Sequence, residues 1–255
     1  MNLNADILSV IKSYLDEFDI NIVNMSVDGD YHITLQTAMT DELCFYVAQC
    51  GHVSILKWLL ANGREWDELF GYQAAQYGHL SILQFAKDNG YYFNIDLYDI
   101  AIRYGYLNIL QWMPANEHEL STDICLNAAY YGHLDILQWA RKNGFEWDVD
   151  TCANAAFGGY FDILQWARAN GCPWDSTICS NAADIGRLDI LIWARENGCE
   201  WDHEVYTFAA YSGHLDILIW AQANGCPCDY EFLMRLTVAE NIQQWILANK
   251  TLLNQ

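Results

Sequence analysis

The stretch from Trp147 to Cys172 reads WDVDTCANAAFGGYFDILQWARANGC, and the chain repeats it from Trp174 to Cys199 as WDSTICSNAADIGRLDILIWARENGC. Outward from these two copies, the pattern recurs every 27 residues in both directions. One glycine marks each copy at a constant place: Gly51, Gly78, Gly105, Gly132, Gly159, Gly186 and Gly213. A fixed period of about 20 to 50 residues is the sequence signature of a repeat array, in which neighbouring copies stack on one another.

The repeats divide the chain into three parts. Seven copies cover residues 40–228, and six of them carry a second glycine twelve residues after the first. Residues 229–255 keep only part of the pattern, because Glu240 replaces the first glycine and the tryptophan shifts to Trp245. We interpret this part as a degenerate C-terminal capping repeat. Residues 1–39 do not follow the repeat.

Each copy is predicted to form two short α-helices. The first helix carries paired small residues, such as Ala155-Ala156, which allow a neighbouring helix to approach closely. It ends at the glycine, because glycine tolerates the left-handed conformation that a helix end often needs. The second helix is predicted to begin at a residue with an N-capping side chain, namely Ser54, Ser81, Asn108, Asp135, Asp162, Asp189 or Asp216. No stretch alternates with period two for long enough to indicate a strand, so the predicted fold class is all-α.

The motif Ala-Ala-x-x-Gly-His-Leu-x-Ile-Leu, at Ala128–Leu137 and Ala209–Leu218, resembles the helix–turn–helix part of an ankyrin repeat. An ordinary ankyrin unit has about 33 residues. Here the stretch that forms its projecting hairpin is replaced by a short Trp-Asp connector, as at Trp147-Asp148. Such short, tryptophan-rich repeats are similar to those of ankyrin proteins from amoeba-infecting giant DNA viruses and some protists. The resemblance implies an ankyrin-like helix–turn–helix solenoid with short connectors, whose first helices line a concave, partner-binding side.

The amino-acid composition indicates which classes of molecule the protein can bind. The chain has 33 acidic and 12 basic residues, a formal net charge of −21, which disfavours nucleic acid because phosphate binding requires a basic surface. A basic protein partner is compatible with this charge, although solubility alone would also explain it. No run of eighteen apolar residues predicts a membrane span, and Asp6 precedes Lys12, unlike in a secretory signal. We expect a monomer in the cytoplasm, or in the host cytoplasm if the chain is viral.

Side chains that recur at one position in several copies are interpreted as packing residues. Tryptophans fill two columns, one in the second helix and one in the connector, where stacking of repeats would bury them. Histidines follow the first glycine at His52, His79, His133 and His214, where the ankyrin family places a histidine that bonds neighbouring backbone. Because Tyr106, Tyr160 and Arg187 replace them in the other copies, we predict no metal site.

The nine cysteines are predicted to be reduced, since an odd number cannot form a complete set of disulfides within one chain. Two columns hold seven of them and look like small buried positions: Cys44, Cys125, Cys152 and Cys179 in first helices, and Cys172, Cys199 and Cys226 after the second glycine. No phosphate loop, dinucleotide fingerprint or hydrolase motif is present. We therefore predict no catalytic residue, no cofactor and no enzymatic activity.

The positions that vary while the scaffold stays constant are the most informative about function. Two columns of the first helix lie four residues apart and so share a face, and a third column directly precedes the first glycine. These columns hold several tyrosines and an arginine, residue types that dominate binding hot spots. The predicted partner-binding residues are Tyr72, Gln76, Tyr77, Arg103, Tyr104, Tyr130, Tyr131, Phe157, Asp184 and Tyr211. The alternative is a loosely constrained surface, or tyrosines that pack against adjacent repeats.

The third repeat departs from the pattern in its second helix. Where other copies continue with Ala-Arg-x-Asn-Gly after the tryptophan, this one reads Met113-Pro114-Ala115-Asn116-Glu117. Proline inside a helix removes a backbone hydrogen bond and clashes with the preceding turn. We predict a shortened or kinked second helix in this repeat.

The segment before the array reads DILSVIKSYLDEFDINIVNMSV over residues 6–27 and resembles the start of an F-box. The opening Leu-Pro of an F-box is Asn4-Ala5 here, and its later part is not recognisable in residues 28–39. The resemblance implies docking on a Skp-type linker through Leu8, Ile11, Tyr14, Leu15 and Ile20. The alternative is a capping helix that closes the end of the array. The sequence thus predicts a protein–protein interaction module, either a ubiquitin-ligase substrate adaptor or a plain ankyrin scaffold.

Overall fold

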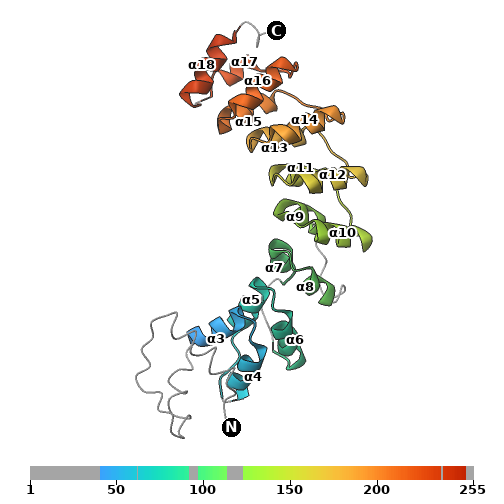
Figure 1. Cartoon of the computed structure of the whole chain (residues 1–255), viewed down its shortest axis with the longest axis vertical. Helices are drawn as coiled ribbons and strands as arrows, with labels where there is room; N and C mark the ends of the chain where they lie inside the picture. The colour runs from blue at the N-terminus through green and yellow to red at the C-terminus, as the bar shows by residue number, and fades with distance from the viewer. Residues whose placement is uncertain (1–40, 62, 92–96, 114–122, 237, 251–255) are drawn as a thin grey trace. The chain divides into compact units, whose positions relative to one another are not determined.

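The structure is a computed structural model that describes residues 41–61, 63–91, 97–113, 123–236 and 238–250. The chain divides into two compact units, residues 1–113 and 114–255, which are described separately (Figure 1). Every described element is a helix, and the described ranges contain no β-strand. Odd-numbered helices are the first helices of their repeats and even-numbered helices are the second.

The first unit contains three helix pairs from the first three repeats. Its helices are α3 (Asp41–Gln49), α4 (Val53–Ala61), α5 (Glu68–Gln76), α6 (Leu80–Asp88), α7 (Leu97–Tyr104) and α8 (Leu107–Trp112). Each first helix packs against the second helix of its own repeat, and α3 packs against α5 as α5 does against α7. The core consists of the Ile-Leu pair of the second helices together with the small residues of the first helices.

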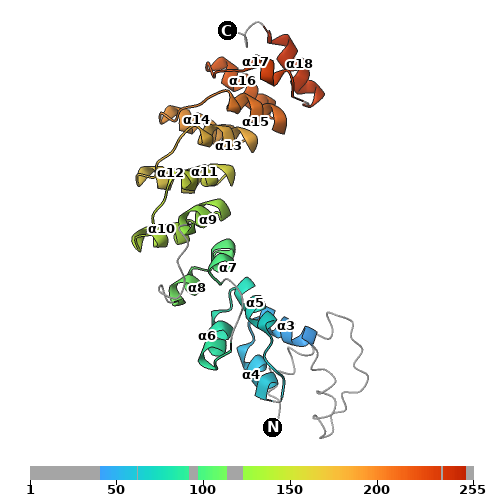
Figure 2. The ribbon, with the colours of Figure 1, turned by 180° about the vertical axis from the view of Figure 1, so that it is seen from behind.

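The second unit contains four regular pairs and a degenerate last pair. Its helices are α9 (Ile124–Tyr131), α10 (Leu134–Lys142), α11 (Val149–Phe157), α12 (Phe161–Ala169), α13 (Thr177–Asp184), α14 (Leu188–Glu196), α15 (Glu204–Ser212), α16 (Leu215–Ala223), α17 (Tyr230–Leu233) and α18 (Glu240–Ala248). The first helices α9, α11, α13 and α15 lie side by side in both views (Figures 1 and 2). Their alanine pairs are fully buried, which lets these backbones approach closely.

The glycine between the two helices of a repeat has two structural roles. Gly132 ends α9 in the left-handed conformation with φ +85°, as predicted from the sequence. A β-carbon at this position would also lie 2.4 Å from the ring of Tyr160 in the next repeat. The second glycine of the same repeat, Gly144, has the same φ of +85° but nothing within 4 Å of its would-be β-carbon. In this repeat, both glycines are favoured by their positive φ, and Gly132 alone is also required by the close contact with the next repeat.

The predicted start of the second helices was wrong. Each of these helices begins one residue before the Ser, Asn or Asp column, and the N-cap is the His, Tyr or Arg residue, such as His133 for α10. No N-cap of this column makes a side-chain capping bond in the described helices α6 to α16. The carbonyl oxygen after the glycine instead accepts the first helical bond, from Leu137 to His133 in α10. The aspartates stand in the first turn, where the helix dipole favours negative charge.

The third repeat has the shortened second helix that its proline predicts. Helix α8 contains six residues, whereas α6 and α10 contain nine each. Its C-cap, Met113, is extended with ψ 137°, the conformation that a following proline favours by clashing with the α region. The chain thus leaves the helix directly before Pro114, and the boundary between the two compact units falls at the same peptide bond.

Candidate protein-interaction surface

In the first unit, the predicted binding residues lie at the C-terminal ends of the first helices, except Tyr72, which lies in the middle of α5. Tyr72, Tyr77 and Tyr104 have 36%, 43% and 42% of their surface exposed. Gln76 in the last turn of α5 donates to the hydroxyl of Tyr104 at 3.2 Å. This bond joins one repeat to the next and fixes the orientation of a tyrosine that still faces solvent. Arg103 is exposed and pairs with Asp99 at 3.2 Å.

The corresponding Gln49 in α3 donates to the Tyr77 hydroxyl at 2.7 Å. The sequence left two interpretations of the tyrosines, exposure to a partner or packing against adjacent repeats, and in this unit both hold. Tyr77 and Tyr104 pack against the neighbouring repeat and are exposed at the same time. A partner would meet side chains whose conformational entropy is already reduced.

In the second unit, one column forms a continuous row along the first helices. We call Tyr130, Phe157, Asp184 and Tyr211 the turn-side row, because all four lie in the last turn of their helices. The rings of Tyr130 and Phe157 stack with centroids 6.1 Å apart, and Tyr211 is 74% exposed. Asp184 accepts a hydrogen bond from Ser212 at 2.6 Å. Tyr131, half-buried, meets the ring of Tyr130 edge-on.

The column four residues earlier in the first helix is less exposed than the sequence predicted. Tyr72 is exposed, but Ala153 and Ser180 are buried in the second unit. At Ala153 and Ser180, the side chains of this column therefore face the interior of the stack and not solvent. Ser212 was not among the predicted residues, although it occupies the same column as Tyr77 and Tyr104 and bonds a member of the turn-side row.

The column after the first glycine joins successive repeats at the same edge. His79 binds the carbonyl oxygen of Gln49 at 2.7 Å, and His214 binds that of Asp184 at 3.0 Å, as the ankyrin resemblance implied. Tyr106 donates to Gln76 at 3.0 Å in the same way, and Arg187 donates to Gly159. Different side chains thus satisfy the end of the preceding first helix, so the column is structural.

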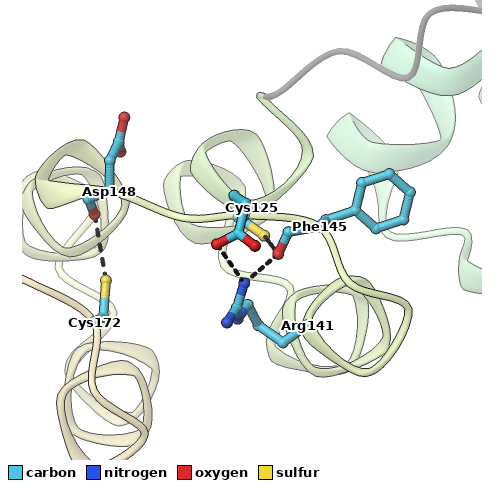
Figure 3. Close-up of polar contacts among 6 residues, drawn as sticks. Cys125, Arg141, Phe145, Asp148 and Cys172 are labelled. Carbon is cyan, nitrogen blue, oxygen red and sulfur yellow. Dashed lines mark hydrogen bonds and ion pairs between the residues drawn. The ribbon is translucent and has the colours of Figure 1, made fainter.

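The opposite ends of the helices form the connector edge, where basic residues hold the connectors between repeats. Arg141 in α10 donates to the carbonyl oxygen of Phe145 and lies 3.6 Å from Glu146 (Figure 3). Its guanidinium also covers the ring of Trp147 at 4.3 Å. The same arrangement recurs with Arg168 over Trp174 at 4.3 Å and Arg195 over Trp201 at 4.2 Å.

The connector tryptophans also contact the next second helix. Trp147 meets Trp166 edge-on at 5.8 Å, and Trp174 and Trp201 meet Trp193 and Trp220 at 5.6 Å. These half-buried rings therefore pack between repeats, as their recurrence predicted.

All nine cysteines are free thiols, as predicted, and seven of them are buried. At the connector edge, Cys172 donates to the carbonyl oxygen of Asp148 at 3.3 Å (Figure 3), and Cys199 donates to that of Asp175 at 3.1 Å. Burial raises the pKa of Cys125 to about 11 and that of Cys226 to about 12. Thiols with such raised pKa values stay protonated at neutral pH and are poor nucleophiles.

Within the described ranges, no group of three or more His, Cys, Asp or Glu side chains is arranged to hold a metal ion. None of the described helices is both long and apolar enough to cross a bilayer. The F-box-like residues Leu8, Ile11, Tyr14, Leu15 and Ile20 lie outside the described residues.

Comparison with solved structures supports the fold class. The chain is similar to the human ASB11 ankyrin repeat domain, with a TM-score of 0.52 and 16% sequence identity. The match covers 69% of this chain and 96% of that domain. No protein-family model matches the chain, and no curated protein matches it. The fold is therefore an all-α, ankyrin-like stack of helix–turn–helix repeats, with short connectors in place of hairpins.

Proposed function

We propose that the protein is a protein–protein interaction module that binds a target protein through the ends of its first helices. The carrying observation is that, within each of the two units, exposed aromatic side chains occupy positions that vary between otherwise regular repeats. Tyr72, Tyr104, Tyr130, Phe157 and Tyr211 are all exposed, although the positions were chosen from sequence variation alone. Tyrosine supplies a large contact area at low entropic cost, which makes it a frequent binding hot spot.

The module would perform no chemistry of its own. Seven of the described cysteines are buried and two are half-buried, and His79 and His214 each bond a backbone carbonyl oxygen. Ankyrin-like stacks typically act as interaction scaffolds. The absence of a spanning helix among the described residues agrees with action in the cytoplasm, or in a host cytoplasm for a viral chain.

We further propose that the module is a substrate adaptor of a cullin–RING ubiquitin ligase. The support is the F-box-like sequence of residues 6–27 placed before the array. In this proposal Leu8, Ile11, Tyr14, Leu15 and Ile20 dock on the Skp-type linker, and the array holds the target. The rival proposal is a plain ankyrin scaffold or competitive binder in which residues 1–39 serve as a cap.

The test is a pull-down of the full-length protein with a purified Skp-type linker. A Leu8→Asp, Leu15→Asp variant of the full chain serves as the comparison, and a Tyr130→Ala, Tyr211→Ala variant is the matched control. The adaptor proposal expects the linker to bind the wild type and the tyrosine variant but not the aspartate variant. Absence of linker binding by the wild type, with loss of thermal stability in the aspartate variant, would identify residues 1–39 as a cap.

A further inference from the structure

The Lys and Arg residues in the described helices of the second unit lie at one end of the helix pairs, where exposed acidic residues such as Glu196 lie as well. First helices α9, α11, α13 and α15, all within the described part of the chain, contain no Lys or Arg. The basic residues of the second helices stand in their last turns, as Arg141, Lys142, Arg168 and Arg195 do. That end is the connector edge, where the three arginines cover tryptophan rings and bond backbone carbonyls.

The other end of the same helices is acidic. Each second helix begins at the turn with an exposed aspartate in its first turn, at Asp135, Asp162, Asp189 and Asp216. First helices end at the same turn, so these carboxylates stand at the end of the helices that carries the turn-side row. Asp184 adds a carboxylate within the row. The base at this end, Arg187, is held by Asp189 at 2.7 and 2.8 Å and by the Gly159 carbonyl.

Aromatic rings and carboxylates in one row favour a cation as the binding group. The face of a tyrosine or phenylalanine ring attracts a guanidinium or ammonium, and arginine is preferred because its plane also stacks. The row members lie at the C-terminal ends of their helices, where the helix dipole adds partial negative charge. An acidic partner would meet repulsion at every repeat.

We propose that the turn-side row, with the aspartates beside it, binds an extended basic segment of the partner protein. This inference rests on the proposed interaction function and names the chemistry of its target. Adjacent packed helices lie about 8–10 Å apart, and an extended polyproline II chain advances about 3.1 Å per residue with three residues per turn. A basic residue at about every third position would therefore meet successive repeats.

The direct test measures binding of labelled 12-residue peptides to the full-length protein by fluorescence anisotropy. The probes are Arg-Gly-Ser, Lys-Gly-Ser and Glu-Gly-Ser, each repeated four times. We expect the arginine peptide to bind at least about tenfold more tightly than the glutamate peptide and more tightly than the lysine peptide, with affinity falling as salt rises. Equal binding of all three peptides, or none by the arginine peptide, would overturn the inference.

Matched variants separate a specific site from net charge. The Asp162→Asn, Asp216→Asn variant should weaken arginine-peptide binding about three- to tenfold, because two carboxylates at the turn edge are lost. The Glu196→Gln, Glu200→Gln variant removes the same charge at exposed positions on the connector edge and should leave binding unchanged. Equal weakening by both variants would contradict a site at the turn edge. Tyr211→Leu should weaken binding about threefold by removing an aromatic face.

A crosslinking readout distinguishes failure of this inference from failure of the proposed function. A photo-reactive phenylalanine analogue is placed at Tyr211 in the full chain, with the same substitution at Glu200 as the control. Captured segments rich in Arg and Lys would support the inference. Captured segments that are neutral or acidic would overturn it while leaving the interaction function standing. Capture no stronger at position 211 than at position 200 would contradict both.

Discussion

The two edges of the second unit are built from the same repeats and obey different rules. At the connector edge, arginine, tryptophan and cysteine recur in nearly every copy, and each arginine contacts both a ring and a backbone carbonyl. At the turn edge the glycine is constant, whereas the column after it bonds the preceding repeat through different side chains, such as Arg187 and His214. Beside them, the turn-side row changes from tyrosine to phenylalanine, aspartate and tyrosine again.

This comparison separates the residues that stabilise stacking from those free to specify a partner. A position that packs against the next repeat in one fixed geometry, as the first glycine and the connector tryptophan do, can vary little. A position that faces solvent carries no such constraint and can change with its target. Three substitutions and one titration test this separation of roles.

The largest effect is expected from Gly132→Ala. A left-handed alanine costs about 1–2 kcal/mol, and its β-carbon would lie 2.4 Å from the Tyr160 ring, so we expect a total loss of about 2–4 kcal/mol. Gly144→Ala has the same φ of +85° without the contact and should lose only the first amount. Urea unfolding followed by circular dichroism measures both. Equal losses would show that contact between repeats adds nothing at the turn edge.

Trp174→Ala should cause the next largest loss of stability. The variant loses the contacts with Arg168 at 4.3 Å and with Trp193 at 5.6 Å, and we expect a loss of about 2 kcal/mol for this half-buried ring. Unfolding curves of Arg168→Met, which keeps much of the side-chain volume, isolate the cationic part of the interaction. A stability equal to wild type for Trp174→Ala would contradict a packing role for the connector edge.

Alkaline pH should destabilise the fold through the buried thiols. The pKa of Cys125 is raised by burial from its usual 9.0 to about 11, so above pH 9 the unfolded chain releases a proton that the folded chain retains. The thiol's contribution to the free energy of unfolding is thus fully present below pH 9. It falls between pH 9 and 11, by at most about 1.4 kcal/mol per pH unit for each thiol. Cys125→Ala should flatten this decline relative to wild type; an unchanged slope would refute the assignment.

Tyr211→Ala should have the smallest effect on stability and the largest ratio of binding loss to stability loss. Its side chain is 74% exposed, and exposed substitutions change stability by about 0.5 kcal/mol or less. As a hot spot, it would weaken target binding by about 2 kcal/mol. Thermal melts and titration of a captured target measure the two quantities. A stability loss as large as that of Trp174→Ala would place Tyr211 among the packing residues.

The repeat pattern was sufficient to predict the helices, the buried thiols and the packing role of the tryptophans. It also predicted that α8 is short, because a proline restricts the backbone conformation of the residue before it in any surroundings. The start of the second helices was mispredicted from side-chain preference, since backbone bonds after the glycine set that boundary. The inward turn of Ala153 and Ser180 was also missed, because helical spacing places residues on one face without stating what that face meets.

By itself, the sequence determined the period, the helix–turn–helix unit and the columns that vary, because each is a property of spacing along the chain. Only the tertiary structure decided which of those columns faces solvent and which residues restrain it. Gln49 and Tyr77 lie 28 residues apart, yet they bond across repeats at 2.7 Å. The gathering of arginines at one edge of the second unit likewise emerges only when antiparallel helices bring its connectors to one side. Packing converts a repeated list of residues into a connector edge that joins repeats and a turn edge that exposes varied side chains.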